Sequence, residues 1–472
     1  MRPWILLLLA LGGSRPLSGQ VIDTVLLDEQ AFVHHPFVYS TFSSLMDRSG
    51  LPFLYTANVE YGLRVYDITD ATSPIEVEAA WPPVFGGLKP TGLHQEGSLL
   101  YVALGGFQGS TQPAGLAVLD VTDPADPVIL DQWDSSAFST GSAIVRVRNG
   151  YAFLGAMEHG LVILDVSDPS AIDFVSAYLP DTVWPGIVNY APNARGMALR
   201  GDTLFLCFDA GCLRAIDVSD KSAPVEIGHY VNPQQPANTA VAYNNAVLVG
   251  DHLFVATDFC GFEVVDVSDP ANMTQVAWVN PWSCLGLSWF GSDGHSNELV
   301  TAMHDSLLFI SGGDSEVLIY DITTPAQPAL VGGFIHPNDS AVAWGLDVHG
   351  DRLLLNYIDN SLVLWPPQPY YADDGGFQLF TWQTELSTEV LGTAETDRTI
   401  RVWPNPTTGP LNVAVDGPSQ VVVRDLLGRE RWRGGLLGPV ARIDLVSLEQ
   451  GSYVVEVAAG GGTRLVRVVI QP

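Results

Sequence analysis

The stretch Leu161-Val162-Ile163-Leu164-Asp165-Val166-Ser167-Asp168-Pro169 decides the fold, because close copies of it recur along the chain. Each copy has an apolar run, an Asp, one apolar residue, a Ser or Thr and usually a second Asp. The other five copies are Leu63–Asp70, Leu116–Pro124, Leu213–Asp220, Phe262–Pro270 and Val317–Pro325, and Ser361–Trp365 is a degenerate seventh. The central Asp residues of the six clear copies are 45 to 55 residues apart, a period typical of repeat architectures.

Each copy belongs to a four-stranded unit. A second apolar run, such as Tyr151–Gly155, precedes it across a short polar or Gly-containing loop, as in a β-hairpin. A third run lies upstream and a fourth downstream in most units. In 161–164 both alternating sets of side chains are apolar, so the sheet must be covered on both faces. Radial stacking of seven such sheets satisfies this requirement, and the sequence therefore predicts an all-β fold with a seven-bladed β-propeller.

The repeats, taken over roughly residues 50–365, resemble the bacterial LVIVD repeat family. The resemblance implies a propeller on a secreted or surface protein, and it carries no defined catalytic residues. A propeller closes when one terminus lends a strand to the blade at the other terminus. Two segments could complete blade seven, Val21–Leu27 and Phe377–Trp382, and the sequence does not decide between them.

The repeated Asp residues are interpreted as structural. Asp and the following Ser or Thr can bond nearby backbone N–H groups at the end of a strand, and Asp-Pro favours a turn. A catalytic pair needs one copy, whereas this motif occurs once per blade.

The chain divides into four parts. Residues 1–19 begin with one basic residue, continue with the short apolar run Trp4–Leu11 and end in small residues, which predicts a secretory signal peptide. Residues 20–382 form the propeller, and the polar segment 383–400 is a linker. From residue 401 onward the basic residues outnumber the acidic ones, so 401–472 is assigned to a separate small domain.

The C-terminal domain resembles the type A sorting domain of the type IX secretion system. Short alternating strands broken by Gly and Pro predict an Ig-like β-sandwich. The resemblance implies recognition by the outer-membrane translocon and a secreted or cell-surface location. The residues that match the sorting signal are Pro404, Asn405, Pro406, Gly409, Asp425, Gly428, Gly451 and Tyr453.

Composition excludes one class of partner. The 472 residues include 52 acidic and 21 basic side chains, a formal net charge of −31. Such a chain repels phosphate backbones, so no nucleic-acid partner is expected. No stretch reaches the roughly 20 apolar residues of a membrane-spanning helix, so no transmembrane segment is predicted.

Four cysteines lie in blades four and five. Export to an oxidising compartment allows disulfides. Cys207 and Cys212 flank one hairpin loop, while Cys260 and Cys284 lie in two loops expected on the same face of the propeller. The predicted bridges are Cys207–Cys212 and Cys260–Cys284, and a zinc site is the alternative.

The loops on one face of the propeller carry the candidate ligand-binding residues. Aromatic residues, a histidine and several carboxylates suit a carbohydrate, a peptide or a divalent cation, although long loops also pack aromatic side chains on one another. The candidates are Trp184, Tyr190, Trp282, Trp289, His295, Glu158, Asp209, Asp258, Asp314 and Asp359.

The preferred function is a secreted or surface-anchored binding or adhesion module for a carbohydrate or protein ligand. The chain has no nucleophile elbow, no His-Glu-x-x-His motif, no calcium loop and no phosphate-binding loop, so we assign no catalytic residue, metal or cofactor. The first alternative is an extracellular hydrolase or lyase with an acidic site on the loop-rich face. A converged pair of carboxylates, or a metal, at the mouth of the central channel would favour it. The second alternative is a structural envelope component.

Overall fold

The computed structural model divides the chain into two compact units, residues 1–387 and 388–472, and each is described by itself. It describes residues 22–35, 40–80, 82–106, 111–181, 192–234, 242–282, 294–313, 316–334, 341–359 and 375–386 of the first unit. In the second unit it describes residues 401–403, 410–414, 419–425, 430–436, 440–448, 451–459 and 462–470. The predicted signal peptide lies outside these ranges. Within them, no helix has the length and apolarity needed to cross a membrane.

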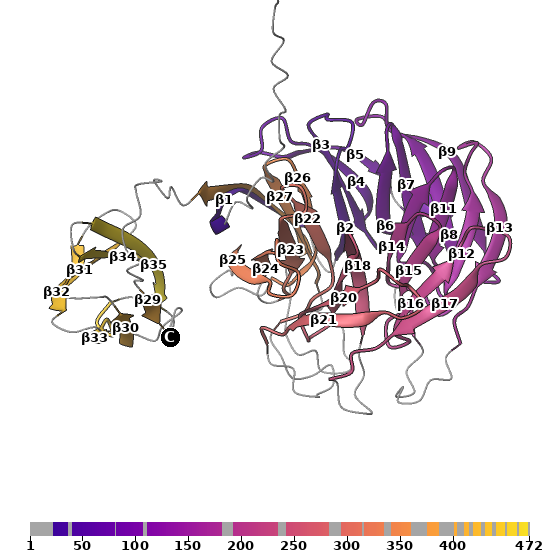
Figure 1. Ribbon diagram of the computed structural model, residues 1–472. Helices are drawn as coiled ribbons and strands as arrows, with labels where there is room; N and C mark the ends of the chain where they lie inside the picture. The colour runs from indigo at the N-terminus through magenta and orange to yellow at the C-terminus, as the bar shows by residue number, and fades with distance from the viewer. Residues whose placement is uncertain are drawn as a thin grey trace, which may run out of the picture. The chain divides into compact units, whose positions relative to one another are not determined.

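The first unit contains seven four-stranded antiparallel sheets in its described residues (Figure 1). Blade one consists of β2 (Thr41–Met46), β3 (Phe53–Asn58), β4 (Gly62–Asp67) and β5 (Ile75–Ala80). Blade two consists of β6 (Lys89–Glu96), β7 (Leu99–Gly105), β8 (Ala114–Asp120) and β9 (Val128–Ser135). Blade three consists of β10 (Ile144–Arg148), β11 (Tyr151–Gly155), β12 (Leu161–Asp165) and β13 (Asp173–Tyr178). One 3-10 helix, Pro82–Phe85, precedes β6.

Blades four to six have the same order. Blade four consists of β14 (Gly196–Arg200), β15 (Thr203–Cys207), β16 (Leu213–Asp217) and β17 (Val225–Tyr230). Blade five consists of β18 (Tyr243–Val249), β19 (His252–Thr257), β20 (Phe262–Asp266) and β21 (Thr274–Val279). Blade six consists of β22 (Leu299–Ala302), β23 (Leu307–Ser311), β24 (Val317–Asp321) and β25 (Ala329–Phe334). Each blade is a meander, as the repeat predicts.

The central strands are covered on both faces. In β12, Val162 and Leu164 pack in a core shared with blade two, whereas Leu161 and Ile163 pack in a core shared with blade four. Alternate side chains of one strand therefore bury against different neighbours. This confirms the reason that the sequence offered for radial stacking.

The ring closes through blade seven. Its order from the inside is β26 (Ala343–His349), β27 (Arg352–Tyr357), β28 (Gly375–Leu386) and β1 (Ile22–His35). Both candidate closing segments are therefore used, one as the third strand and one as the fourth. β28 takes the position predicted for Ser361–Trp365, which lies outside the described residues. The innermost strand β26 contacts β2 of blade one, so the seven sheets form a closed ring.

The repeated aspartates bond to their own turns. Asp165 accepts hydrogen bonds from Ser167 N, at 2.9 Å, and from its hydroxyl, at 2.6 Å. Asp168 bonds Ser170 in the same way. Equivalent bonds to the first Asp recur at Asp67, Asp120, Asp217, Asp266 and Asp321. The motif thus completes the turn between the third and fourth strands.

The predicted Cys207–Cys212 bridge is wrong, because both thiols are free and buried. The strand register places Cys207 opposite Leu213, so Cys212 lies one position beyond the last cross-strand pair. Cys212 also has a left-handed backbone, with φ 75°. The two cysteines thus do not form a directly opposed pair that a disulfide could join. Cys260 is disulfide-bonded, and Cys284, its predicted partner, lies outside the described residues.

Alkylation with N-ethylmaleimide tests this arrangement. In the folded protein Cys207 should resist the reagent, because its thiol is fully buried and burial raises its pKa far above the usual range. In denaturant without reductant, peptides that contain Cys207 and Cys212 should carry the label, and the Cys260 peptide should not. Peptide mass spectrometry reads the result, and a Cys207–Cys212 cross-linked peptide would contradict it.

The second unit has two sheets in its described residues. One is β29 (Arg401–Trp403), β30 (Pro410–Ala414) and β33 (Val440–Asp444); the other is β31 (Ser419–Asp425), β32 (Glu430–Leu436), β34 (Gly451–Ala459) and β35 (Gly462–Ile470). Both sheets share one apolar core, with Leu411 and Ile443 from the first and Val423 and Val455 from the second. Residues of two sheets that bury against each other form a β-sandwich.

Three residues of the predicted sorting signal lie in this sandwich. Asp425 ends β31 opposite Tyr453 of β34, Tyr453 is buried in the core, and Gly451 begins β34 with φ 149°. Pro404, Asn405, Pro406, Gly409 and Gly428 lie outside the described residues.

Candidate functional site

The innermost strands of the seven blades surround a central channel. Each contacts the innermost strand of the next blade, and the series closes from β26 to β2. Strands in this position leave an unpaired edge, and that edge faces the channel. Side chains at the start of these strands therefore meet at one mouth, on the side where the chain enters each blade.

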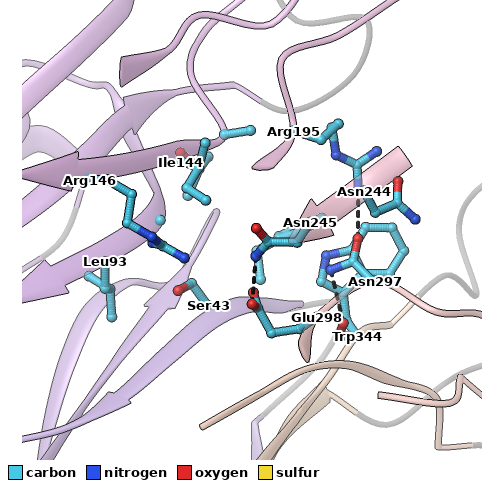
Figure 2. A pocket seen from close by; sticks show the side chains of 14 residues that line it. Ser43, Leu93, Ile144, Arg146, Arg195, Asn244, Asn245, Asn297, Glu298 and Trp344 are labelled. Atoms are coloured by element: carbon cyan, nitrogen blue, oxygen red, sulfur yellow. Dashed lines mark hydrogen bonds between the residues drawn. The ribbon is translucent and has the colours of Figure 1, made fainter. Parts of the chain in front are cut away.

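All seven blades contribute to a cavity of about 50 Å³ at this mouth. Figure 2 shows that the labelled side chains converge from different blades. The lining residues are Phe42, Ser43, Thr91, Gly92, Leu93, Ala143, Ile144, Arg146, Arg195, Asn244, Asn245, Asn297, Glu298 and Trp344.

A larger cavity of about 540 Å³ continues along the channel. It shares Ser43, Leu93, Arg146 and Glu298 with the mouth. Its volume falls in the range of about 300–1,000 Å³ that small-molecule sites occupy. The mouth and the larger cavity are therefore treated as one candidate site.

Amide and guanidinium groups form a network across the mouth. Arg195 Nη2 donates to Asn297 Oδ1 at 2.9 Å, and Asn297 Nδ2 donates to Trp344 O at 2.9 Å. Asn245 Nδ2 donates to Glu298 Oε1 at 2.5 Å. Figure 2 marks these three bonds. The network joins blades four to seven, so the polar groups are held in place before any ligand arrives.

Aromatic rings stand beside this network. The Trp344 indole stacks on the His295 ring, with centroids 4.9 Å apart and an interplanar angle of 16°. Phe42 meets the indole edge-on at 5.5 Å. Arg195 Cζ lies 5.5 Å from the centroid of the same indole, within cation–π distance. Blades four, six, seven and one thus meet at Trp344.

A buried contact between a histidine and an aspartate lies behind Trp344. His295 Nε2 and Asp258 Oδ1 are 2.6 Å apart, and both side chains are buried. Asn244 Nδ2 donates to Asp258 Oδ1 at 3.3 Å and to Ser296 O at 2.8 Å. The contacts orient the imidazole against the indole.

Asp209 lies close enough to Asp258 for the two charges to interact. Asn193 Nδ2 donates to Asp209 Oδ2 at 3.3 Å. Burial raises the pKa of Asp209 to about 6, and the Asp258 charge adds to the rise while Arg195 opposes it. Among the described residues, Asp209 Oδ1 has no hydrogen-bond partner. Asp209 is thus a buried carboxyl that titrates near neutral pH.

Both aspartates also occupy a recurring backbone position. Met157, Asp209, Asp258 and Gly313 follow the second strand of blades three to six, and all four have positive φ, between 33° and 63°. Their carbonyls accept N–H groups of the next blade, from Ala194, Tyr243, Ser296 and Ala343. Asp tolerates a left-handed backbone better than most residues. The position therefore links neighbouring blades whatever its side chain does.

The structure brings together some of the residues that the sequence singled out. Asp209, Asp258 and His295 belong to the cluster behind the mouth. The Trp282 indole packs directly against Gly294, which leaves no room for a Cβ atom there. Because Gly294 precedes His295 in the sequence, Trp282 lies beside the cluster. Asp359 lies at the junction of blades seven and one, where its backbone exchanges hydrogen bonds with the Ser40 hydroxyl.

The other candidates do not join this cluster or are not described. Glu158 is exposed on the hairpin of blade three. Trp184, Tyr190, Trp289 and Asp314 lie outside the described residues. Within the described residues, no group of three or more His, Cys, Asp or Glu side chains is arranged to hold a metal ion.

Sequence reasoning missed the residues that line the channel, namely Arg146, Arg195, Asn244, Asn245, Asn297, Glu298 and Trp344. The signal that could have found them is the presence of charged and amide side chains in or just before the first strand of a blade. Arg146, for example, interrupts the apolar run 143–147 that lies upstream of the hairpin of blade three.

Two family models match the chain. Residues 401–471 match the secretion system C-terminal sorting domain, and residues 141–179, 192–232 and 244–280 match the LVIVD repeat. The three repeat matches fall on blades three, four and five. No curated protein sequence matches the chain.

Solved structures with the same fold include U3-55K, with a TM-score of 0.54 at 9% identity over 77% of this chain and 100% of that chain. The WD40 repeats of RRP9 have a TM-score of 0.52 at 9% identity, over 77% of this chain and 100% of that chain. The mitotic checkpoint complex has a TM-score of 0.50 at 12% identity, over 80% of this chain and 98% of that chain. At these identities the likeness shows the fold alone. With the sorting domain as evidence of export, the chain is a secreted or outer-membrane-surface LVIVD-repeat β-propeller protein that ends in the C-terminal sorting domain of the type IX secretion system.

Proposed function

We propose that the protein is an extracellular binding module and that its propeller holds a carbohydrate at the mouth of the central channel. The observation that carries the proposal is the convergence of three amides, two guanidinium groups and two aromatic rings at one mouth. Amides and guanidinium groups exchange hydrogen bonds with hydroxyl groups, and aromatic faces cover the apolar side of a sugar. Export to the cell exterior places such a site among polysaccharides and glycoproteins.

The size of the mouth limits how the ligand sits. A cavity of about 50 Å³ accepts a single substituent rather than a whole ring. A sugar would therefore lie across the mouth, with one polar substituent inserted between Arg195, Asn245 and Asn297. Preformed donors reduce the ordering cost of binding.

A glycan array with the full-length secreted protein tests the proposal. The wild type should bind a defined subset of glycans, and Arg195→Met should weaken binding by about tenfold or more, because one charged hydrogen bond is worth roughly 1.5–3 kcal/mol. Arg200→Met is the matched control, since Arg200 ends β14 and pairs with the exposed Asp251. The control should bind as the wild type does.

Other results of this experiment identify the alternatives. Binding to a peptide array but not to glycans would support a protein ligand. Silence on both arrays, with both variants folded, would support a structural envelope role and contradict the proposal.

Hydrolysis is the second candidate function, and the observation that favours it is the close approach of Asp209 and Asp258. A carboxyl that titrates near pH 6 suits a general acid. Turnover of chromogenic glycosides that Asp209→Asn abolishes, with folding preserved, would support an enzyme. A wild-type protein that binds a glycan without turnover would support the binding module.

A further inference from the structure

Several arginine side chains line the larger channel cavity. Elsewhere in the propeller, most basic side chains pair with carboxylates. Residues 22–386 contain eight arginines and two lysines. Arg48, Arg146 and Arg148 line this cavity, and Arg195 lines the mouth above it. Half of the propeller's arginines thus face the channel, although the chain carries a formal net charge of −31.

Five of the six basic side chains elsewhere in the propeller pair with carboxylates, and Arg352 donates to the carbonyl of Ile68 at 3.5 Å. These pairs are Arg64–Glu76, Lys89–Glu60, Arg200–Asp251, Arg214–Glu226 and Lys221–Asp202. In the cavity, Arg48 pairs with Asp347. Among the described residues, neither Arg146 nor Arg148 has a carboxylate within ion-pair distance. Arg146 donates to the carbonyl of Val145 at 3.1 Å, and Arg148 donates to the carbonyl of Leu199 at 3.4 Å. Their charges are therefore not neutralised by a direct pair.

The Arg146 guanidinium is the central group. Figure 2 shows its side chain extending from β10 into the cavity, toward Ser43. It lines both the mouth and the larger cavity, so a ligand that enters through the mouth meets it. Burial lowers the pKa of Arg146; the Glu298 and Asp347 charges oppose this change, and the nearby Arg48 charge adds to it. Arg146 is half-buried and, within the part of the chain that the structure describes, has no carboxylate at ion-pair distance, so its guanidinium group can still pair with an anion in the cavity.

The two acidic side chains that line the cavity, Asp347 and Glu298, neutralise only part of the positive charge of its arginines. Asp347 is occupied by Arg48 and also accepts from Met46 N at 2.8 Å. Glu298 is bonded to Asn245, and burial raises its pKa to about 7. Three guanidinium groups thus face one paired carboxylate and one carboxyl that is partly protonated at neutral pH.

We infer that the cavity binds a small organic anion through its carboxylate groups, held by Arg146 and Arg148. A guanidinium fork matches a carboxylate through two parallel hydrogen bonds. The apolar side chains of Leu93, Val147, Leu248 and Leu346 also line the cavity, and they provide contacts for a carbon skeleton that inorganic anions lack. A volume of about 540 Å³ admits a molecule of the size of citrate.

Isothermal titration calorimetry of the full-length secreted protein tests the inference, with citrate and succinate as probes and phosphate and chloride as inorganic controls. The carboxylates should bind with 1:1 stoichiometry and at least tenfold more tightly than the inorganic anions. Arg146→Gln should weaken carboxylate binding by about tenfold or more, while Arg200→Gln should leave it unchanged.

Glu298→Gln is a second test variant, and it is expected to strengthen carboxylate binding rather than to weaken it. At pH 8 it removes a negative charge from the cavity and keeps the side-chain volume, so carboxylate binding should tighten by roughly three- to tenfold. Equal affinity for phosphate or chloride, an absence of binding by the wild type, or wild-type affinity in folded Arg146→Gln would each overturn the inference. The glycan experiment depends on Arg195, which lines the mouth and not the larger cavity, so the two proposals can fail separately.

Discussion

A Val25→Asp substitution is expected to lower the free energy of unfolding of the propeller by at least about 4 kcal/mol, because it places an unpaired carboxylate in an apolar core. Val25 is 3% exposed and belongs to a cluster that contains Phe309 of blade six and Phe380 of blade seven. It lies on β1, which pairs with β28 along almost its whole length. Because β1 is the strand that completes blade seven, the substitution should destabilise the blade that closes the ring.

Thermal and urea unfolding, followed by near-ultraviolet circular dichroism, measure this effect. Glu29→Ala is the control on the same strand, because Glu29 is exposed, and it should change stability by no more than about 0.5 kcal/mol. If Val25→Asp unfolded at the same urea concentration as the wild type, β1 would not be part of the folded ring in solution.

The contribution of Glu263 to the stability of the propeller is expected to be lost as the pH rises from 5 to 8. This side chain is fully buried between blades four and five. Tyr230 Oη donates to its Oε2 at 2.6 Å, and Tyr243 Oη donates to its Oε1 at 3.2 Å. Burial nevertheless raises its pKa from 4.5 to about 7, because the hydrogen bonds do not offset the loss of solvation.

The direction follows from proton linkage. A carboxyl whose pKa is raised by folding binds its proton more tightly in the folded state. Its contribution to stability is therefore complete below about pH 4.5 and is lost as the pH rises through about 7. A shift of this size corresponds to a loss on the order of 3 kcal/mol for Glu263. Glu298 and Asp209, with pKa values raised to about 7 and about 6, change stability in the same direction.

Glu263→Gln isolates the contribution of this residue, because glutamine keeps the shape and does not titrate. At pH 8 the variant should be more stable than the wild type, and its stability should fall less between pH 5 and pH 8. Chemical denaturation at a series of pH values measures both curves. Glu29→Gln, at an exposed position, should follow the wild-type curve. A Glu263→Gln curve parallel to the wild type would show that Glu263 does not titrate in this range.

The acid side of the stability curve has a different origin. Hydrogen bonds from the Ser or Thr two residues onward hold the pKa of the repeated aspartates, such as Asp165 and Asp217, below its usual value. Their contribution is present above the ordinary Asp pKa and is lost on acidification through the lower folded value. Burial lowers the pKa of His35 to about 4 and of His94 to about 3, so these side chains add stability as the pH rises toward the ordinary His value and oppose the loss from Glu263 in that range.

Much of the fold could be predicted because it rests on local patterns. The doubly apolar run of 161–164 required cover on both faces, and neighbouring blades provide it. The Asp motif closes the same turn in successive blades, so one copy predicts the others. Closure of blade seven was left open, because the pairing of β1 with β28 joins segments about 350 residues apart.

The candidate site was less predictable. Asp209, Asp258 and His295 were chosen as loop residues, and the structure collects them behind Trp344. Arg146 lies on β10 and Glu298 immediately precedes β22, and at such positions side-chain type alone does not distinguish a channel-facing residue from one that faces a neighbouring blade. The disulfide prediction for Cys207 and Cys212 failed because spacing along the chain does not report strand register.

The amino-acid sequence by itself determined the number of blades, the strand order within each blade from one to six, the export route and the acidic character of the chain. These properties depend on apolar periodicity, turn chemistry and local motifs, which neighbouring residues specify. Only the tertiary structure decided how the ring closes, which cysteines remain free and which polar side chains meet at the channel. Those outcomes depend on contacts between blades, whose geometry arises when seven separately encoded sheets pack around one axis.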